Sequence, residues 1–88
     1  MEISMRFIHL SDLHIGKRVN DFPMYEDQEY VLKQVIDVIK NNNIDGVIIA
    51  GDIYDKAVAP AEAVALYDRF ITSLSYLDIP VFIISGNH

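Results

Sequence analysis

Short runs of strand-forming residues alternate with longer amphipathic segments along the chain, and this alternation limits the folds it can adopt. Short apolar runs that contain Ile, Val or Phe occupy residues 5–10, 46–50 and 81–84, as expected for strands buried on both faces of a sheet. The two intervening segments are each long enough for a helix. The predicted order is therefore β-α-β-α-β, a parallel α/β unit with right-handed crossovers and the second run as its central strand.

The first intervening segment is predicted to be a helix from about residue 24 to residue 42. Asp21 is placed to cap its start just ahead of Pro23. Three consecutive asparagines, 41–43, tolerate the left-handed backbone that often ends a helix. Apolar residues recur at three- and four-residue spacing and predict a buried stripe made of Tyr25, Leu32, Val35, Ile36 and Ile39.

A second helix is expected to begin at Pro60 and to end near Tyr76. Proline is favoured in the first turn of a helix, and Glu62 places a negative charge near the positive end of the helix dipole. Its predicted inner stripe consists of Val64, Tyr67, Phe70, Ile71 and Leu74.

The amino-acid composition excludes several kinds of binding site. The 88 residues include no Cys and 13 acidic against 7 basic residues, for a formal net charge of -6. A disulfide scaffold and a thiolate metal site are excluded, and binding of nucleic acid through a basic surface is not expected. A phosphate-bearing partner would need a group that reverses the local charge, and a bound divalent metal ion is the usual one. With no long apolar run and no signal-peptide pattern, a cytoplasmic protein that does not enter the membrane is expected.

Polar residues follow each predicted strand at the point where it ends. Ser-Asp-Leu-His occupies 11–14, Gly-Asp occupies 51–52, and Gly-Asn-His occupies 86–88. Because the carboxyl ends of parallel strands lie along one edge of a sheet, where open α/β sheets bind ligands, these three clusters should converge.

The first two clusters supply candidate metal ligands. Asp12 and His14 are two residues apart, so in an extended chain their side chains would point the same way and hold one ion from one side. Asp52 follows Gly51, which lacks a Cβ and lets a metal or phosphate come close. A carboxylate at Asp52 can bridge two ions.

The third cluster adds a neutral ligand and a second imidazole. Asn87 offers an amide oxygen, which suits a site where two cations already share an acidic bridge, and His88 would point toward the substrate. The combined oxygen and nitrogen set suits Mn²⁺, Fe²⁺ or Zn²⁺ better than Ca²⁺.

Several other polar residues near the predicted strand ends could have either a structural or a functional role. Asp55 either supports a metal ligand or satisfies loop amides, and the structural role is the commoner one. His9 is expected to be a hydrogen-bonded histidine of the core or rim, and Tyr54 is expected to pack. Lys17 and Arg18 could contact a phosphate backbone, although solvated loop cations are more common.

Taken together, segments 6–17, 51–56 with the following Pro60, and 84–88 resemble the calcineurin-like metallophosphoesterases. Within that family, the stretch 51–62 is most similar to the SbcD branch, the nuclease subunits of bacterial SbcC-SbcD complexes. The resemblance covers nearly the whole chain from Met5 onward. It implies a two-sheet sandwich whose N-terminal half is the β-α-β-α-β unit.

The resemblance also implies roles for individual residues. Asp12 and His14 would bind the first metal, Asp52 would bridge, and Asn87 would bind the second. His88 would contact the scissile phosphate and stabilise or protonate the leaving oxygen. The implied activity is two-metal phosphodiester hydrolysis on DNA, both exonucleolytic and endonucleolytic, in repair and recombination. Two divalent ions, most readily Mn²⁺, an SbcC-like ATPase partner and a homodimer are implied with it.

One departure from the family pattern concerns the residues that would complete the site. Members of this kind carry an acid directly after Gly-Asn-His and three further histidines downstream, two of them as His-x-His, whereas this sequence stops at His88. We therefore expect 1–88 to be the N-terminal part of a single metallophosphoesterase domain, with 1–4 as a start-site extension. Weak metal affinity and little nuclease activity are expected for it alone, because two or three protein ligands per ion rarely exclude water.

Two alternatives stay open at this point. Another phosphoesterase of the same family, acting on nucleotides or phosphoproteins, would use the same half-site. A non-catalytic receiver-like α/β module would hold Mg²⁺ with Asp12 and Asp52. That module requires an acidic pair in the first strand-end loop and a lysine after a later strand, and residues 12–14 and 86–88 do not supply them.

Overall fold

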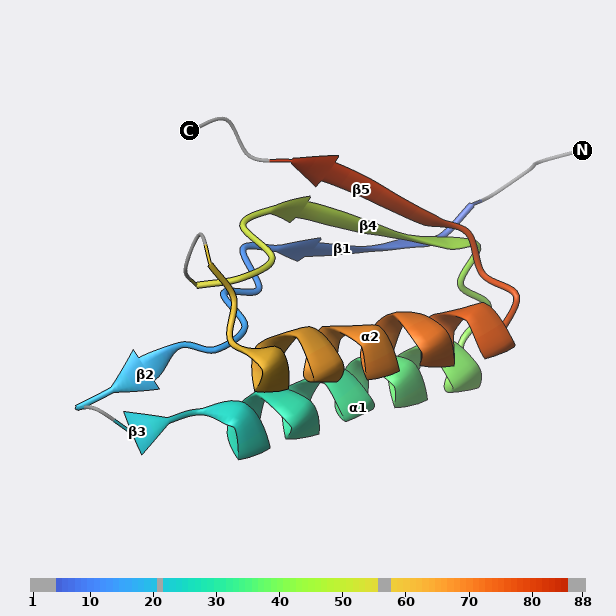
Figure 1. Ribbon diagram of the computed structural model, residues 1–88. Helices are drawn as coiled ribbons and strands as arrows, with labels where there is room; N and C mark the ends of the chain where they lie inside the picture. The colour runs from blue at the N-terminus through green and yellow to red at the C-terminus, as the bar shows by residue number, and fades with distance from the viewer. Residues whose placement is uncertain (1–4, 21, 56–57, 86–88) are drawn as a thin grey trace, which may run out of the picture.

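The central feature of the fold is a three-stranded parallel sheet. A computed structural model describes residues 5–20, 22–55 and 58–85. The sheet has the order β1-β4-β5, formed by β1 (Phe7–Ser11), β4 (Gly46–Gly51) and β5 (Val81–Ser85) (Figure 1). Both strand pairs are parallel and β4 is the central strand, so the predicted α/β unit is confirmed.

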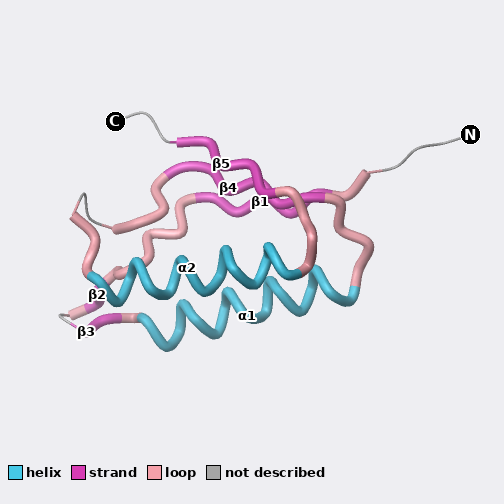
Figure 2. The backbone as a smooth tube through the Cα atoms, turned by 45° about the vertical axis from the view of Figure 1, so that its right-hand side comes forward, coloured by secondary structure: helices cyan, strands magenta, loops and turns pink. Residues whose placement is uncertain are grey.

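Two helices, α1 (Tyr25–Asn41) and α2 (Ala61–Tyr76), lie side by side on one face of this sheet, as Figures 1 and 2 both show. The shared face follows from the topology. Both crossovers are expected to be right-handed, and both step in the same direction across the sheet, so both helices arrive on the same side. Within the described residues, neither helix combines the length and the apolar character that a membrane crossing needs.

The hydrophobic core lies between the helix layer and the sheet. Val47 and Ile49 of β4 are fully buried, at 0% exposure, because the central strand faces both helices. The helices contribute Leu32, Ile39, Leu66, Phe70 and Leu74, and the loop after β1 contributes Ile15. The stripe predicted for α1 is confirmed, since Tyr25, Val35 and Ile36 pack against this core as partly buried residues.

The stripe predicted for α2 was wrong at its start. Ala63 and Leu66 are buried there, whereas Val64 is 38% exposed. Relative to the prediction, the helix is rotated about its axis, and the small side chain of Ala63 faces the loop after β1. Ala63 lies next to Gly16 of this loop, since a Cβ placed on Gly16 would lie 3.4 Å from the Cβ of Ala63, at van der Waals contact.

The opposite face of the sheet is open in the part of the chain that the structure describes. Phe7 on β1 and Phe82 and Ile84 on β5 are 45%, 53% and 57% exposed. The prediction that all three strands are buried on both faces was therefore wrong for the outer strands, because both helices cover the same face (Figure 2).

A small hairpin that the sequence pattern did not predict precedes α1. The two-residue strands β2 (Arg18–Val19) and β3 (Phe22–Pro23) pair antiparallel. The helix begins at Tyr25, within one residue of the predicted start near residue 24, and its N-cap is Met24, which makes no side-chain capping hydrogen bond. Asp21, the predicted cap, lies outside the described residues.

Helix α1 also terminates in a different way from the one predicted. Asn42 has an extended backbone, with φ of -135°, instead of the left-handed conformation. Its side-chain amide donates a hydrogen bond to the Val38 carbonyl oxygen at 2.8 Å. This bond satisfies one carbonyl of the last turn, which would otherwise lack an intrahelical partner.

Candidate metal centre

The loops that follow β1 and β4 run side by side beyond the edge of the sheet and continue its parallel pairing. Three backbone N–H groups of the first loop donate to carbonyl oxygens at the end of β4 and in the second loop: Asp12 to Ala50 at 2.9 Å, His14 to Asp52 at 3.2 Å, and Ile15 to Ile53 at 2.9 Å. The Asp55 N–H returns a bond to the Ile15 carbonyl oxygen at 3.0 Å. Ile15, at 1% exposure, anchors the first loop in the core. The two loops therefore hold each other in register.

Asp12 and His14 approach each other by a backbone geometry that differs from the extended one predicted. Both residues are left-handed, with φ of 52° and 46°. Left-handed backbone is unfavourable for residues other than glycine, although Asp is among the more tolerant. The prediction of an extended Asp-x-His segment was wrong, and the loop pairing described above supplies the contacts that hold the strained conformation in place.

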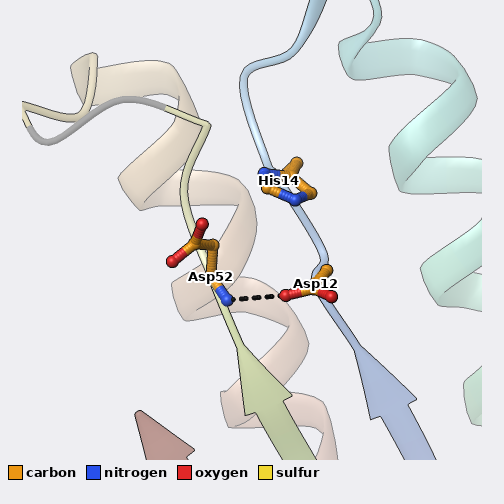
Figure 3. Close-up of side chains that lie close together, drawn as sticks. All are labelled: Asp12, His14 and Asp52. Carbon is orange, nitrogen blue, oxygen red and sulfur yellow. Dashed lines mark hydrogen bonds between the residues drawn. The ribbon is translucent and has the colours of Figure 1, made fainter. Parts of the chain in front are cut away.

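Gly51 is required at the end of β4 for two reasons. Its φ is 82°, in the left-handed region, and a Cβ placed on it would collide with the Asp12 carboxylate, lying 2.8 Å from its Cγ. The Asp12 side chain therefore occupies the space that glycine leaves empty. The Asp52 N–H then donates to Asp12 Oδ1 at 3.1 Å, drawn as the dashed line in Figure 3.

The three described candidate ligands converge at this edge. Asp12, His14 and Asp52 each offer one ligand atom, and these atoms all lie within 4.8 Å of one another (Figure 3). With ligand bonds of about 2.1 Å, donors on opposite sides of an ion lie about 4.2 Å apart and adjacent donors about 3 Å apart, so the three side chains would move inward to bind one ion. Two carboxylates and an imidazole are also a donor set that first-row divalent metals accept. The residues present therefore fit a divalent metal, while their individual roles remain predictions.

Asp55 lies beside the imidazole of His14. Its Oδ1 is 3.7 Å from His14 Nδ1, and both side chains are about one-third exposed, at 33% and 39%. The carboxylate is thus close to one ring nitrogen and leaves the other available. Since the Asp55 N–H also binds the Ile15 carbonyl oxygen, the residue contributes both to the loop and to the surroundings of His14.

The remaining polar candidates stand apart from this cluster. His9 is exposed on the rim, where its Nε2 lies 3.4 Å from Ser11 Oγ. Lys17, just before the hairpin, and Arg18, the first residue of β2, are both exposed. Tyr54 packs edge-on against the ring of Tyr67 at 5.7 Å, as predicted for a packing residue. Its pKa is raised because burial disfavours the phenolate, with a further contribution from the charge of Asp68.

Asn87 and His88, the predicted ligand of the second metal and the predicted catalytic residue, lie outside the described residues. β5 reaches the same edge as the cluster, because Ser85 pairs in register with Gly51.

One contact of the site was not predicted from the sequence: the side chain of Gln28, on α1, is hydrogen-bonded to the backbone of the His14 loop. A helical glutamine carries no chemical signal of its own, and only its position four residues before Leu32, on the same side of α1, hints at this contact.

The family model of the calcineurin-like phosphoesterases matches residues 5–88. The match spans the sheet, both helices and all three strand-end clusters. It argues against the receiver-like alternative and agrees with the candidate site of Asp12, His14 and Asp52. Metal-dependent hydrolysis of phosphate esters is the chemistry that both observations support.

Proposed function

The chain belongs to the calcineurin-like phosphoesterase family, and we propose that it is the N-terminal part of a DNA nuclease of the SbcD type. The observation that carries the hydrolytic part of this proposal is the convergence of Asp12, His14 and Asp52 within 4.8 Å at the carboxyl edge of the sheet. The proposed reaction is hydrolysis of phosphodiester bonds in DNA, with both exonuclease and endonuclease activity in repair and recombination.

In this proposal the residues of the edge hold two divalent ions, with Mn²⁺ as the favoured metal. Asp12 and His14 would hold the first ion, Asp52 would bind both ions, and Asn87 would bind the second. Bound divalent ions would offset the negative charge of the phosphate and lower the pKa of a water molecule. The chain's own contribution is to present the Asp12 carboxylate in a fixed position, because the Asp52 N–H holds its Oδ1 at 3.1 Å. His88 is proposed to contact the scissile phosphate and to protonate the leaving oxygen.

DNA as the substrate is supported by the stretch 51–62, whose sequence is similar to the SbcD branch of the family. The net charge of -6 means that DNA would be held through the metal site and local cations instead of a basic surface. Lys17 and Arg18, both exposed, follow His14 by three and four residues along the chain. An SbcC-like ATPase subunit and a second copy of the protein are the proposed partners.

The test is hydrolysis of linear double-stranded DNA and of a small phosphodiester by the full-length gene product, with Mn²⁺ and with a chelator. We expect Mn²⁺-dependent cleavage of both substrates. Cleavage of nucleotides or a phosphoprotein without cleavage of DNA would instead support another phosphoesterase of this family. Residues 1–88 assayed alone should show little turnover, and robust turnover would contradict the view that the site needs further ligands.

A further inference from the structure

Gln28 of α1 holds the backbone of the loop that carries His14. Its side-chain Nε2 donates to the His14 carbonyl oxygen at 2.9 Å, and its Oε1 accepts from the Gly16 N–H at 3.1 Å. Both polar groups of the amide are therefore used on one loop. The side chain is half-buried, which shields these hydrogen bonds from water.

The direction of the Gln28 side chain is set by the packing of α1. Gln28 precedes Leu32 by four residues, and Leu32 is only 6% exposed in the core. Residues four apart share one face of a helix, so burial of Leu32 turns Gln28 toward the loop. The Gln28 N–H donates to the Met24 carbonyl oxygen at 2.9 Å, which places the residue in the first turn of the helix.

With these contacts, both the backbone N–H and the backbone carbonyl oxygen of His14 are hydrogen-bonded. Its N–H donates to the Asp52 carbonyl oxygen at 3.2 Å, on the side of β4, and its carbonyl oxygen accepts from Gln28 on the side of α1. The residue has a φ of 46°, and Gly16, the other residue bound by Gln28, has a φ of 95°. A left-handed backbone at a residue other than glycine costs roughly 1–2 kcal/mol, so it needs contacts of this kind to persist.

We propose that Gln28 is a positioning residue of the candidate metal centre, which fixes the backbone of His14 so that the imidazole faces Asp12 and Asp52. The proposal rests on the proposed function, because it assumes that His14 binds a metal ion. Gln28 itself acts through the loop and does not belong to the ligand set. Loss of a group that orients a metal ligand typically lowers metal affinity by roughly 10- to 100-fold.

The test compares Gln28→Met with Gln34→Met in the full-length gene product. Both substitutions remove an amide from α1 and keep the side-chain length, but Gln34 is exposed and away from the loop. Mn²⁺ affinity is measured by calorimetry, and thermal unfolding is recorded without metal. Gln28→Met should weaken Mn²⁺ binding about 10-fold, and Gln34→Met should leave it unchanged.

A double-mutant cycle separates positioning from a general structural role. In a His14→Ala background, Gln28→Met should cause no further loss of Mn²⁺ affinity, because the imidazole that Gln28 positions is already absent. A loss of the same size in both backgrounds would overturn the inference.

Gln28→Glu supplies a second variant if the methionine protein folds poorly. It keeps an acceptor for the Gly16 N–H and replaces the donor to the His14 carbonyl with an oxygen. The added negative charge alone would strengthen Mn²⁺ binding, so weaker binding supports positioning and tighter binding overturns it. Wild-type affinity in both Gln28 variants overturns this inference alone, whereas absence of Mn²⁺ binding by the wild-type protein overturns the proposed function as well.

Discussion

Residues in the middle of strand β4 pack in the hydrophobic core, whereas residues at its carboxyl end belong to the candidate metal centre. Val47 and Ile49 are fully buried beneath the helices and have regular strand geometry. Gly51 and Asp52, a few residues later, are half-buried, and Gly51 adopts a left-handed backbone beside the carboxylate of Asp12. The same strand thus contributes to the core at one point and to the candidate metal centre at another.

This difference implies that stability and metal binding can be altered separately. Burial of the Ile49 side chain favours folding. The site residues instead bring two carboxylates close together and include the left-handed Asp12 and His14, features that oppose folding and are tolerated where function needs them. Substitutions in the middle of β4 should therefore reduce stability, and substitutions at its end should reduce metal binding.

The largest effect is expected for Ile49→Ala. Removing a fully buried isoleucine should lower the free energy of unfolding by about 2–5 kcal/mol, as measured by urea denaturation. The control is Ile83→Ala on the edge strand β5, where the side chain is 52% exposed and the loss should be clearly smaller. Activity per folded molecule should be unchanged in both variants. Equal losses of stability would contradict the assignment of the core to the middle of β4.

Asp52→Asn, in contrast to Ile49→Ala, should weaken metal binding without reducing stability. Loss of a carboxylate that is proposed to bridge the two ions should lower Mn²⁺ affinity by more than the roughly 100-fold that loss of a supporting group can cause. The free energy of unfolding without metal should stay constant or rise, because one of two neighbouring negative charges is removed. Asp37→Asn, a matched change on the exposed side of α1, should affect neither quantity. Calorimetric titration with Mn²⁺ gives the affinity, and an unchanged value for Asp52→Asn would remove this residue from the ligand set.

Gly51→Ala should affect both properties, each by an intermediate amount. The left-handed backbone should reduce stability by about 1–2 kcal/mol, and the new Cβ should displace the Asp12 carboxylate and weaken Mn²⁺ binding. Gly46→Ala is the matched control at the other end of β4, where a Cβ would lie 2.7 Å from the Phe7 ring. It should reduce stability without changing Mn²⁺ affinity, so equal loss of affinity in the two variants would argue against a local effect at Gly51.

The smallest effect is expected at Glu29, which links the two helices away from both parts of β4. Its carboxylate lies 3.1 Å from Lys33 Nζ and 3.0 Å from Arg69 Nη2, on α2. The hydrogen bond from Lys33, then that from Arg69, lowers the pKa of Glu29 below its ordinary value of 4.5. A lowered pKa in the folded state means that this stabilisation is present above the ordinary value and is lost as the pH falls through the folded value.

Glu29→Gln should therefore lower the melting temperature slightly at pH 7, and the difference from wild type should disappear in acid. Because the group is exposed, salt should also reduce the difference. Thermal unfolding followed by circular dichroism at several pH values provides the measurement. A difference that persists below the folded pKa would show that Glu29 acts by packing instead of charge.

Several features of this protein follow from the sequence by itself. Three short apolar runs and two amphipathic segments predicted the parallel sheet and both helices, because strand and helix periodicity are local properties. Polar residues at the strand ends predicted the meeting of Asp12, His14 and Asp52, because parallel strands end at one edge. These inferences required no knowledge of how distant segments pack.

The tertiary structure alone decided how those pieces fit together. It set the left-handed backbone of Asp12 and His14, the burial of Ala63 in place of Val64, and the open face of the sheet. It also placed Gln28 against the His14 loop. Each of these features depends on contacts between segments far apart in the chain, such as the pairing of the two loops and the shared face of the two helices. Local patterns specify which elements form, whereas long-range packing fixes their rotation and the conformation of the loops between them.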